Sequence, residues 1–202
     1  MSSIETSSPD RTATLRRTTR ETDIELTLRL DGTGVTEIAT GVGFLDHLLT
    51  ALARHARFDL SLRCEGDLEV DDHHSAEDCA LALGTALDEA LGERRDIRRF
   101  GHAYAPLDEA LVRSVVDISG RPFADVQLGL RREWLGTLST ENVSHVLRSL
   151  ATAARLTLHV DVLRGENDHH RAEAAFKATA LALRDAVARS GHGDVPSTKG
   201  VL

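Results

Sequence analysis

The sequence is poor in aromatic residues, in cysteine and in net positive charge. Phe, Trp and Tyr together make up 3% of its 202 residues, so Leu, Val, Ile and Ala must fill the core. The two cysteines, Cys64 and Cys79, lie outside any C-x-x-C spacing and are expected to be reduced core thiols. A net charge of −8 argues against an extended nucleic-acid surface or a polybasic membrane anchor, although a local basic pocket for a small anion remains compatible with it.

Long apolar runs are also missing. No run approaches the roughly 18 to 20 residues that cross a bilayer, and the chain does not start with basic residues followed by an apolar signal core. We therefore expect a soluble cytoplasmic protein with no nucleic-acid or membrane partner. The length is sufficient for one large or two small domains.

A histidine-rich hexapeptide occurs twice, as DHHSAE at residues 72–77 and as DHHRAE at residues 168–173. Residues three and four apart share a helix face, so Glu77 can chelate a metal together with either His73 or His74. Imidazole nitrogen mixed with carboxylate oxygen suits manganese, iron, cobalt or zinc better than calcium. A simpler interpretation makes Asp72 and Asp168 helix N-caps, but capping gives no reason for the histidine pairs to recur.

The whole chain follows the same duplication. Periodicity predicts strands near residues 24–30, 35–38 and 58–64 with helices over 44–57 and 74–91, and then strands near 111–118, 126–130 and 156–162 with helices over 139–154 and 169–189. His47 in the first copy corresponds to His145 in the second. Two metal ions, each with three histidines, one glutamate and open positions for substrate, would use all eight candidate ligands: His47, His73, His74, Glu77, His145, His169, His170 and Glu173.

Ten segments together carry a family resemblance: Arg20-Glu21-Thr22, Leu30-Asp31-Gly32-Thr33-Gly34, Phe44-Leu45-Asp46-His47, Asp72-His73-His74, Gly84-Thr85-Ala86-Leu87, Ala105-Pro106-Leu107-Asp108-Glu109-Ala110, Ser119-Gly120-Arg121-Pro122, Gly165-Glu166-Asn167, Asp168-His169-His170 and Pro196-Ser197-Thr198-Lys199-Gly200. With them the sequence resembles the imidazoleglycerol-phosphate dehydratases from about residue 11 to its end. It departs from the common pattern at Gly43, Ala51, His102 and Ser144.

The resemblance implies an α+β fold of two similar half-domains, each a four-stranded sheet with two helices on one face, like the second domain of ribosomal protein S5. Composition and the duplication divide the chain into a mobile tail (1–10), a first half-domain (11–93) and a second half-domain (94–190), and the resemblance makes residues 191–202 a substrate-binding tail. It also implies two manganese ions per chain, no organic cofactor, and a homo-oligomer of 24 subunits with metal sites between subunits.

The implied reaction is the dehydration of imidazole glycerol phosphate to imidazole acetol phosphate in histidine biosynthesis. If the ring nitrogens of the substrate bridge two metals, the ring becomes an imidazolate that expels the neighbouring hydroxyl and gives a diazafulvene. The next carbon then loses its proton to a carboxylate. The resemblance assigns that general base to Glu21 and the binding of the phosphate and hydroxyl groups to Arg99, Arg121, Lys177, Ser197, Lys199 and Asp108.

The residues alone leave two other functions open. A dinuclear metallohydrolase would use the same ligands to hold an attacking hydroxide, although such sites contain more carboxylates. A metal-storage or scaffold protein would saturate its metals and would have no use for Glu21 or Lys199. Without the resemblance, Glu21 is a solvated strand-boundary residue, Asp108 a strand-edge carboxylate, and residues 191–202 a frayed tail.

Overall fold

The computed structural model describes residues 10–202, so the tail expected at residues 1–10 lies, except for Asp10, outside the described residues. The elements form two similar runs. The first run contains β1 (Thr12–Thr18), β2 (Thr22–Arg29), β3 (Thr36–Ala39), α1 (Gly43–Ala56), β4 (Asp59–Gly66) and α2 (His73–Leu91). The second contains β5 (Phe100–Leu107), β6 (Ala110–Asp117), β7 (Phe123–Gln127), β8 (Trp134–Leu135), β9 (Leu138–Ser139), α3 (Thr140–Ala153), β10 (Thr157–Arg164) and α4 (Asp168–Val187).

Each run builds a four-stranded sheet with the same strand order, β1-β2-β4-β3 in one and β5-β6-β10-β7 in the other. In both sheets the first three strands pair antiparallel, and the last strand, β3 or β7, pairs parallel to its neighbour. The alternation predicted for residues 24–30 is observed in β2, where Ile24, Leu26 and Leu28 are buried. The duplicated α+β fold is confirmed.

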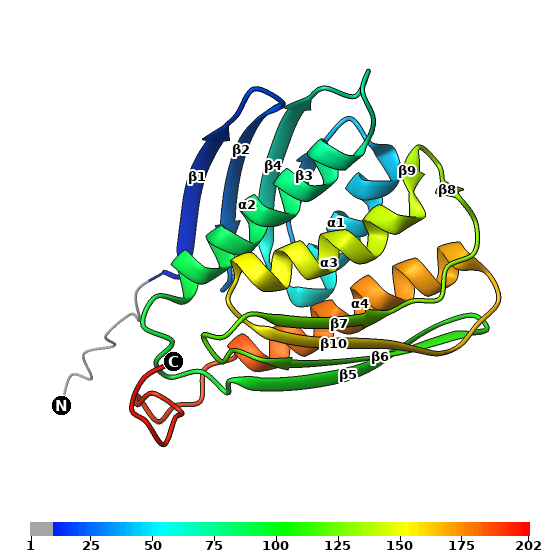
Figure 1. The fold of residues 1–202 in the computed structure, drawn as a ribbon. Helices are drawn as coiled ribbons and strands as arrows, with labels where there is room; N and C mark the ends of the chain where they lie inside the picture. Colours follow the sequence, from blue (N-terminus) through cyan, green and yellow to red (C-terminus); the bar gives the residue numbers. More distant parts are fainter. Residues whose placement is uncertain (1–9) are drawn as a thin grey trace.

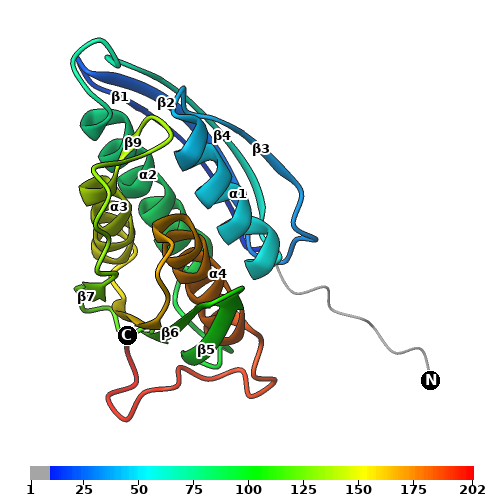
Figure 2. The same cartoon turned by 90° about the vertical axis from the view of Figure 1, so that its right-hand side faces the viewer.

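The four helices lie between the two sheets (Figures 1 and 2). Helices α1 and α2 cover the inner face of the first sheet, and α3 and α4 cover that of the second. Across the middle of the molecule, α2 packs on α3 and α1 packs on α4. Every helix therefore contacts a helix of the other half-domain, which brings together side chains from the two halves of the same chain.

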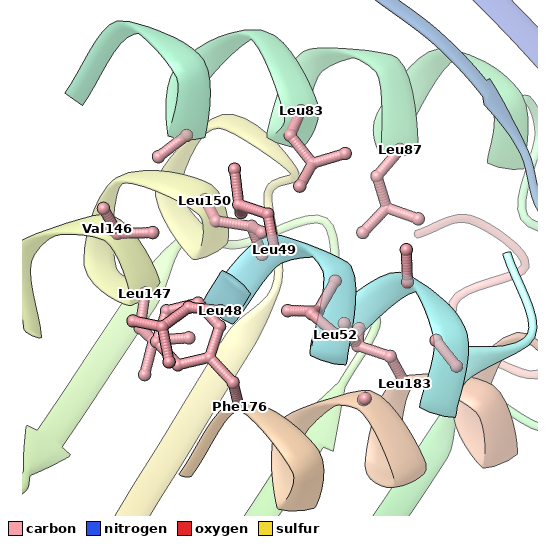
Figure 3. Close-up of a cluster of buried hydrophobic side chains, with 14 of the residues drawn as sticks. Leu48, Leu49, Leu52, Leu83, Leu87, Val146, Leu147, Leu150, Phe176 and Leu183 are labelled. Atoms are coloured by element: carbon pink, nitrogen blue, oxygen red, sulfur yellow. The ribbon is translucent and has the colours of Figure 1, made fainter. Parts of the chain in front are cut away.

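Leucine, valine and alanine fill the space between the helices, as the shortage of aromatic residues required. Figure 3 shows Leu49 of α1, Leu83 of α2, Leu150 of α3 and Phe176 of α4 converging at the centre, all buried. The thiols of Cys64 and Cys79 are free and buried, as predicted.

Some sequence expectations were wrong in detail. Asp108, interpreted without the resemblance as a strand-edge carboxylate, forms with Glu109 the turn between β5 and β6. The strand predicted through residue 130 ends at Gln127, and the β8–β9 hairpin was not anticipated. No described helix is long and apolar enough to span a bilayer.

Candidate metal-binding site

The predicted ligands form two clusters, and each cluster combines both halves of the chain. The Glu77 cluster consists of His73 and Glu77 from α2 with His145 from α3. The Glu173 cluster consists of His169 and Glu173 from α4 with His47 from α1. The pairing of α2 with α3 and of α1 with α4 is what creates these two sites.

The spacing of the donor atoms suits a metal ion. The Nε2 atoms of His47 and His169 lie 3.0 and 3.1 Å from Oε2 of Glu173. In the other cluster, Nε2 of His145 lies 3.0 Å from Oε1 of Glu77, and Nε2 of His73 lies 3.7 Å from its Oε2. Ligand atoms about 2.1 Å from a cation and at right angles to each other are about 3 Å apart, which matches the Glu173 cluster and the His145 side of the Glu77 cluster. His73 stands farther from Glu77, but all the candidate ligand atoms of each cluster lie within 4.8 Å of one another.

The side chains of both aspartates of the repeated hexapeptide accept hydrogen bonds from the backbone of another segment of the chain. Oδ2 of Asp72 accepts a 2.7 Å hydrogen bond from the backbone N–H of Ser139, which ties the start of α2 to the start of α3. Oδ2 of Asp168 accepts from the backbone N–H groups of Arg131 and Arg132, both at 2.7 Å. The N-cap of α4 is Asn167. Asp72 occupies the N-cap position of α2, as the capping interpretation expected, but its side chain makes no capping hydrogen bond. For Asp168, which is the first residue of α4, the capping interpretation is wrong.

The second histidine of each pair turns away from the clusters. Nδ1 of His74 lies 3.0 Å from Oδ2 of Asp67, and Nδ1 of His170 lies 2.6 Å from Oε2 of Glu109. A carboxylate at Nδ1 fixes the imidazole and leaves Nε2 free, which is the usual support of a metal-ligating histidine. These hydrogen bonds raise the pKa of His74 and His170 above 6.5. Among the described residues, one chain therefore brings two histidines and one glutamate to each cluster, and the third histidine predicted for each metal lies outside it.

Two further carboxylates lie beside these outlying histidines. Oε1 of Glu21, in the turn between β1 and β2, lies 3.7 Å from Nε2 of His74. Oδ2 of Asp108, in the equivalent turn between β5 and β6, lies 3.8 Å from Nε2 of His170. Both carboxylates are more than half exposed, so they are available to a bound molecule.

Lys177 joins the Glu173 cluster. Its Nζ lies 2.6 Å from Oε1 of Glu173, one helical turn earlier on α4. Partial burial raises the pKa of Glu173, but the hydrogen bonds from Lys177 and His47 outweigh it and hold the pKa at about 2. Glu173 is therefore ionised at neutral pH and able to hold a cation.

The other predicted phosphate-binding residues lie at the opposite end of the molecule. The backbone N–H of Arg99 donates to the carbonyl of Ala186, near the end of α4, and its guanidinium bonds Asp117 and the carbonyl of Pro196. Seventeen residues of helix, about 25 Å, separate Ala186 from His169. The tail that carries Ser197 and Lys199 lies at this same end, at the lower left of Figure 1.

Sequence reasoning missed two supporting residues, Asp67 and Asn142. Oδ1 of Asn142, which is buried, lies 2.9 Å from Nδ1 of His73. Asn142 could have been suspected because it precedes His145 by three residues and so shares its helix face. Asp67 gives no such signal, because its contact with His74 depends on the path of the loop after β4.

Comparison with known proteins finds one family throughout. The model of the family described as imidazoleglycerol-phosphate dehydratase matches residues 40–183. The dehydratase of Candida glabrata is 57% identical over 208 residues, covering 94% of this chain and 99% of the relative, and that of Salinibacter ruber is 56% identical, covering 95% and 96%.

Solved structures agree with the sequence comparisons. The crystal structure of the Pyrococcus furiosus dehydratase superposes with a TM-score of 0.80 at 40% identity, covering 93% of this chain and 100% of that one. The Staphylococcus aureus structure also gives 0.80, at 38% identity, with 88% and 99% covered. The chain belongs to the imidazoleglycerol-phosphate dehydratase family, whose members are hydro-lyases of histidine biosynthesis.

Proposed function

We propose that this chain dehydrates imidazole glycerol phosphate to imidazole acetol phosphate with two manganese ions and no organic cofactor. The observation that carries the proposal is the pair of two-histidine, one-glutamate clusters. Family membership favours this reaction over the metallohydrolase and the metal-storage protein that the residues alone left open. When bound, the two ions would hold the imidazole ring of the substrate as an imidazolate, and loss of the hydroxyl would then give a diazafulvene.

Each cluster lacks one of the three histidines expected for a metal, and each chain has two outlying histidines, His74 and His170. Asp67 and Glu109 occupy the Nδ1 side of these histidines, so their Nε2 atoms, which face Glu21 and Asp108, are the ones that can bind a metal. We infer that a neighbouring copy supplies one of them to complete each cluster. Catalysis then requires a homo-oligomer, for which the family resemblance implies 24 subunits.

Glu21 is our candidate for the general base. Its carboxylate stands 3.7 Å from Nε2 of His74, so a metal held by His74 would bring bound substrate within its reach. Asp108 stands in the same relation to His170 and would orient a substrate hydroxyl. A base exposed in the single chain becomes enclosed when a second copy covers it, which protects the proton transfer from bulk water.

The phosphate would be bound by Arg99, Arg121, Lys177, Ser197 and Lys199. Lys177 lies at the Glu173 cluster, whereas the tail and Arg99 lie at the far end of α4. We therefore propose that the phosphate pocket joins the tail end of one copy to the metal end of another. We also propose a cytoplasmic location, which the free thiols of Cys64 and Cys79 support.

The test is to add imidazole glycerol phosphate to manganese-loaded protein, detect the keto product, and count manganese by elemental analysis. We expect turnover that depends on manganese and two ions per chain. His145→Asn should lose one ion and most activity. The matched control His159→Asn, which removes an exposed histidine on the outer face of the second sheet, should retain both. One tightly bound ion with no gain from added manganese would contradict the proposal.

A further inference from the structure

The two clusters are equivalent in fold position but differ in the charge beside the glutamate. Lys177 occupies Oε1 of Glu173, so only Oε2 faces the two histidines. The residue in the same position of α2, four after Glu77, is Leu81. Both oxygens of Glu77 therefore remain directed at histidines, Oε1 at His145 and Oε2 at His73.

The two clusters also differ in the residue that contacts one of their histidine rings from the neighbouring helix. In the Glu77 cluster, the buried amide oxygen of Asn142 lies 2.9 Å from Nδ1 of His73. The equivalent position in α1, three residues before His47, is Phe44, and its ring meets the ring of His169 edge-on with centroids 5.0 Å apart. A hydrogen bond at Nδ1 orients an imidazole and strengthens it as a metal ligand, whereas an aromatic ring offers no comparable acceptor.

We infer that the two metal sites of this chain have unequal affinities, with the Glu77 cluster binding its ion more tightly and filling first. The inference rests on the proposed function. An ammonium group next to a ligand carboxylate repels an incoming cation and withholds one of the two ligand oxygens. The Glu173 cluster carries this cost and lacks the amide support, so both differences favour the Glu77 cluster.

The expected difference in metal affinity follows from the effect that residues in contact with metal ligands have in other proteins. Residues that contact metal ligands typically change metal affinity by about 10- to 100-fold. We therefore expect manganese to bind in two steps whose dissociation constants differ by about that factor. The ion at the Glu173 cluster is then the one lost first on dilution or mild chelation.

The test is equilibrium dialysis of the full chain against manganese without substrate, with free manganese measured by electron paramagnetic resonance. Lys177→Met removes the ammonium and keeps the length of the side chain, so it should tighten the weaker step by about tenfold or more. Leu81→Lys places an ammonium four residues after Glu77, so it should weaken the tighter step. Circular dichroism and Lys177→Gln guard against a folding defect in the first variant.

The measured dissociation constants decide whether the two sites differ in affinity and whether Lys177 causes the difference. Equal dissociation constants in the unmodified chain, or a difference that Lys177→Met and Lys177→Gln leave unchanged, would overturn the inference while leaving the two-metal proposal intact. A chain that binds no manganese at all would overturn the proposed function, and this inference with it.

Discussion

The two adjacent histidines at the start of α2 point in different directions, and so do the two at the start of α4. Neighbours on a helix point about 100° apart, so His73 joins Glu77 while His74 faces Asp67. The same division separates His169 from His170. Each histidine pair therefore places one imidazole in a cluster of its own chain and a second imidazole, hydrogen-bonded at Nδ1, outside that cluster.

At the residue scale, the first prediction concerns Glu21. Glu21→Gln should keep manganese content and lower kcat by about 10² to 10⁴, because a positioned base contributes about that much to the rate. Steady-state kinetics with elemental analysis will check it. The matched control is Glu25→Gln, which changes an exposed glutamate on β2 that pairs with Arg16. If Glu21→Gln turns over at the unmodified rate, another residue is the base and Asp108 is the next to test.

At the element scale, the close approach of α2 and α3 depends on Gly84. A Cβ added there would lie 2.5 Å from the carbonyl oxygen of Leu150 and 2.7 Å from Cβ of Ala153, both on α3. Because these neighbours include rigid helix backbone, a methyl group cannot be accommodated without moving the helices apart. The same two helices carry His73, Glu77 and His145.

Gly84→Ala should therefore lower the free energy of unfolding by about 1 to 3 kcal/mol and weaken manganese binding at the Glu77 cluster. Urea denaturation and metal titration will measure the two effects. Gly43→Ala is the control, because a Cβ there meets nothing within 4 Å and should change stability by less than about 1 kcal/mol. Equal stability of both variants would show that the helices can separate at no cost.

At the scale of the whole molecule, metal and assembly should be linked. Metal sites completed by a neighbouring copy stabilise the associated state by mass action, so chelation should break a large oligomer into smaller species. Light scattering before and after chelation will measure the change. The double variant His74→Asn with His170→Asn should fail to form the large species, whereas His159→Asn should form it. A metal-loaded monomer, or a particle of unchanged mass after metal removal, would contradict this link.

Acid should have the same effect as chelation, because a proton competes with the metal for each histidine. The pKa values of His74 and His170 are raised above 6.5, so proton competition begins at higher pH than for an ordinary histidine. Association should be complete well above these pKa values and be lost as pH falls through them.

In the metal-free chain the effect of pH on stability is opposite. The pairs of His74 with Asp67 and of His170 with Glu109 stabilise the fold below pH 6.5, and their contribution is lost as pH rises through the raised pKa values.

Much of this molecule could be predicted from local pattern. Alternation in residues 24–30 and the apolar stripe that begins at Phe44 gave β2 and α1, because period-2 and period-3.6 burial leave direct traces in a sequence. The recurrence of the histidine pairs, together with the match of His47 to His145, predicted the six residues that the structure gathers in two clusters. It also predicted His74 and His170, which lie outside the clusters. The turn at Asp108 and Glu109 was missed because it contains no glycine and because the apolar residues Leu107 and Ala110 flank it directly.

The sequence by itself determined the duplicated fold, the family and the candidate ligands, since periodicity and motif spacing are properties of neighbours along the chain. Only the tertiary structure decided which ligands meet. His47 joins Glu173 and His145 joins Glu77 because helices of opposite halves pack together, and no spacing along the chain encodes that contact. The tertiary structure also separated the tail from the clusters by the length of α4, and it placed Lys177 against the glutamate of the Glu173 cluster.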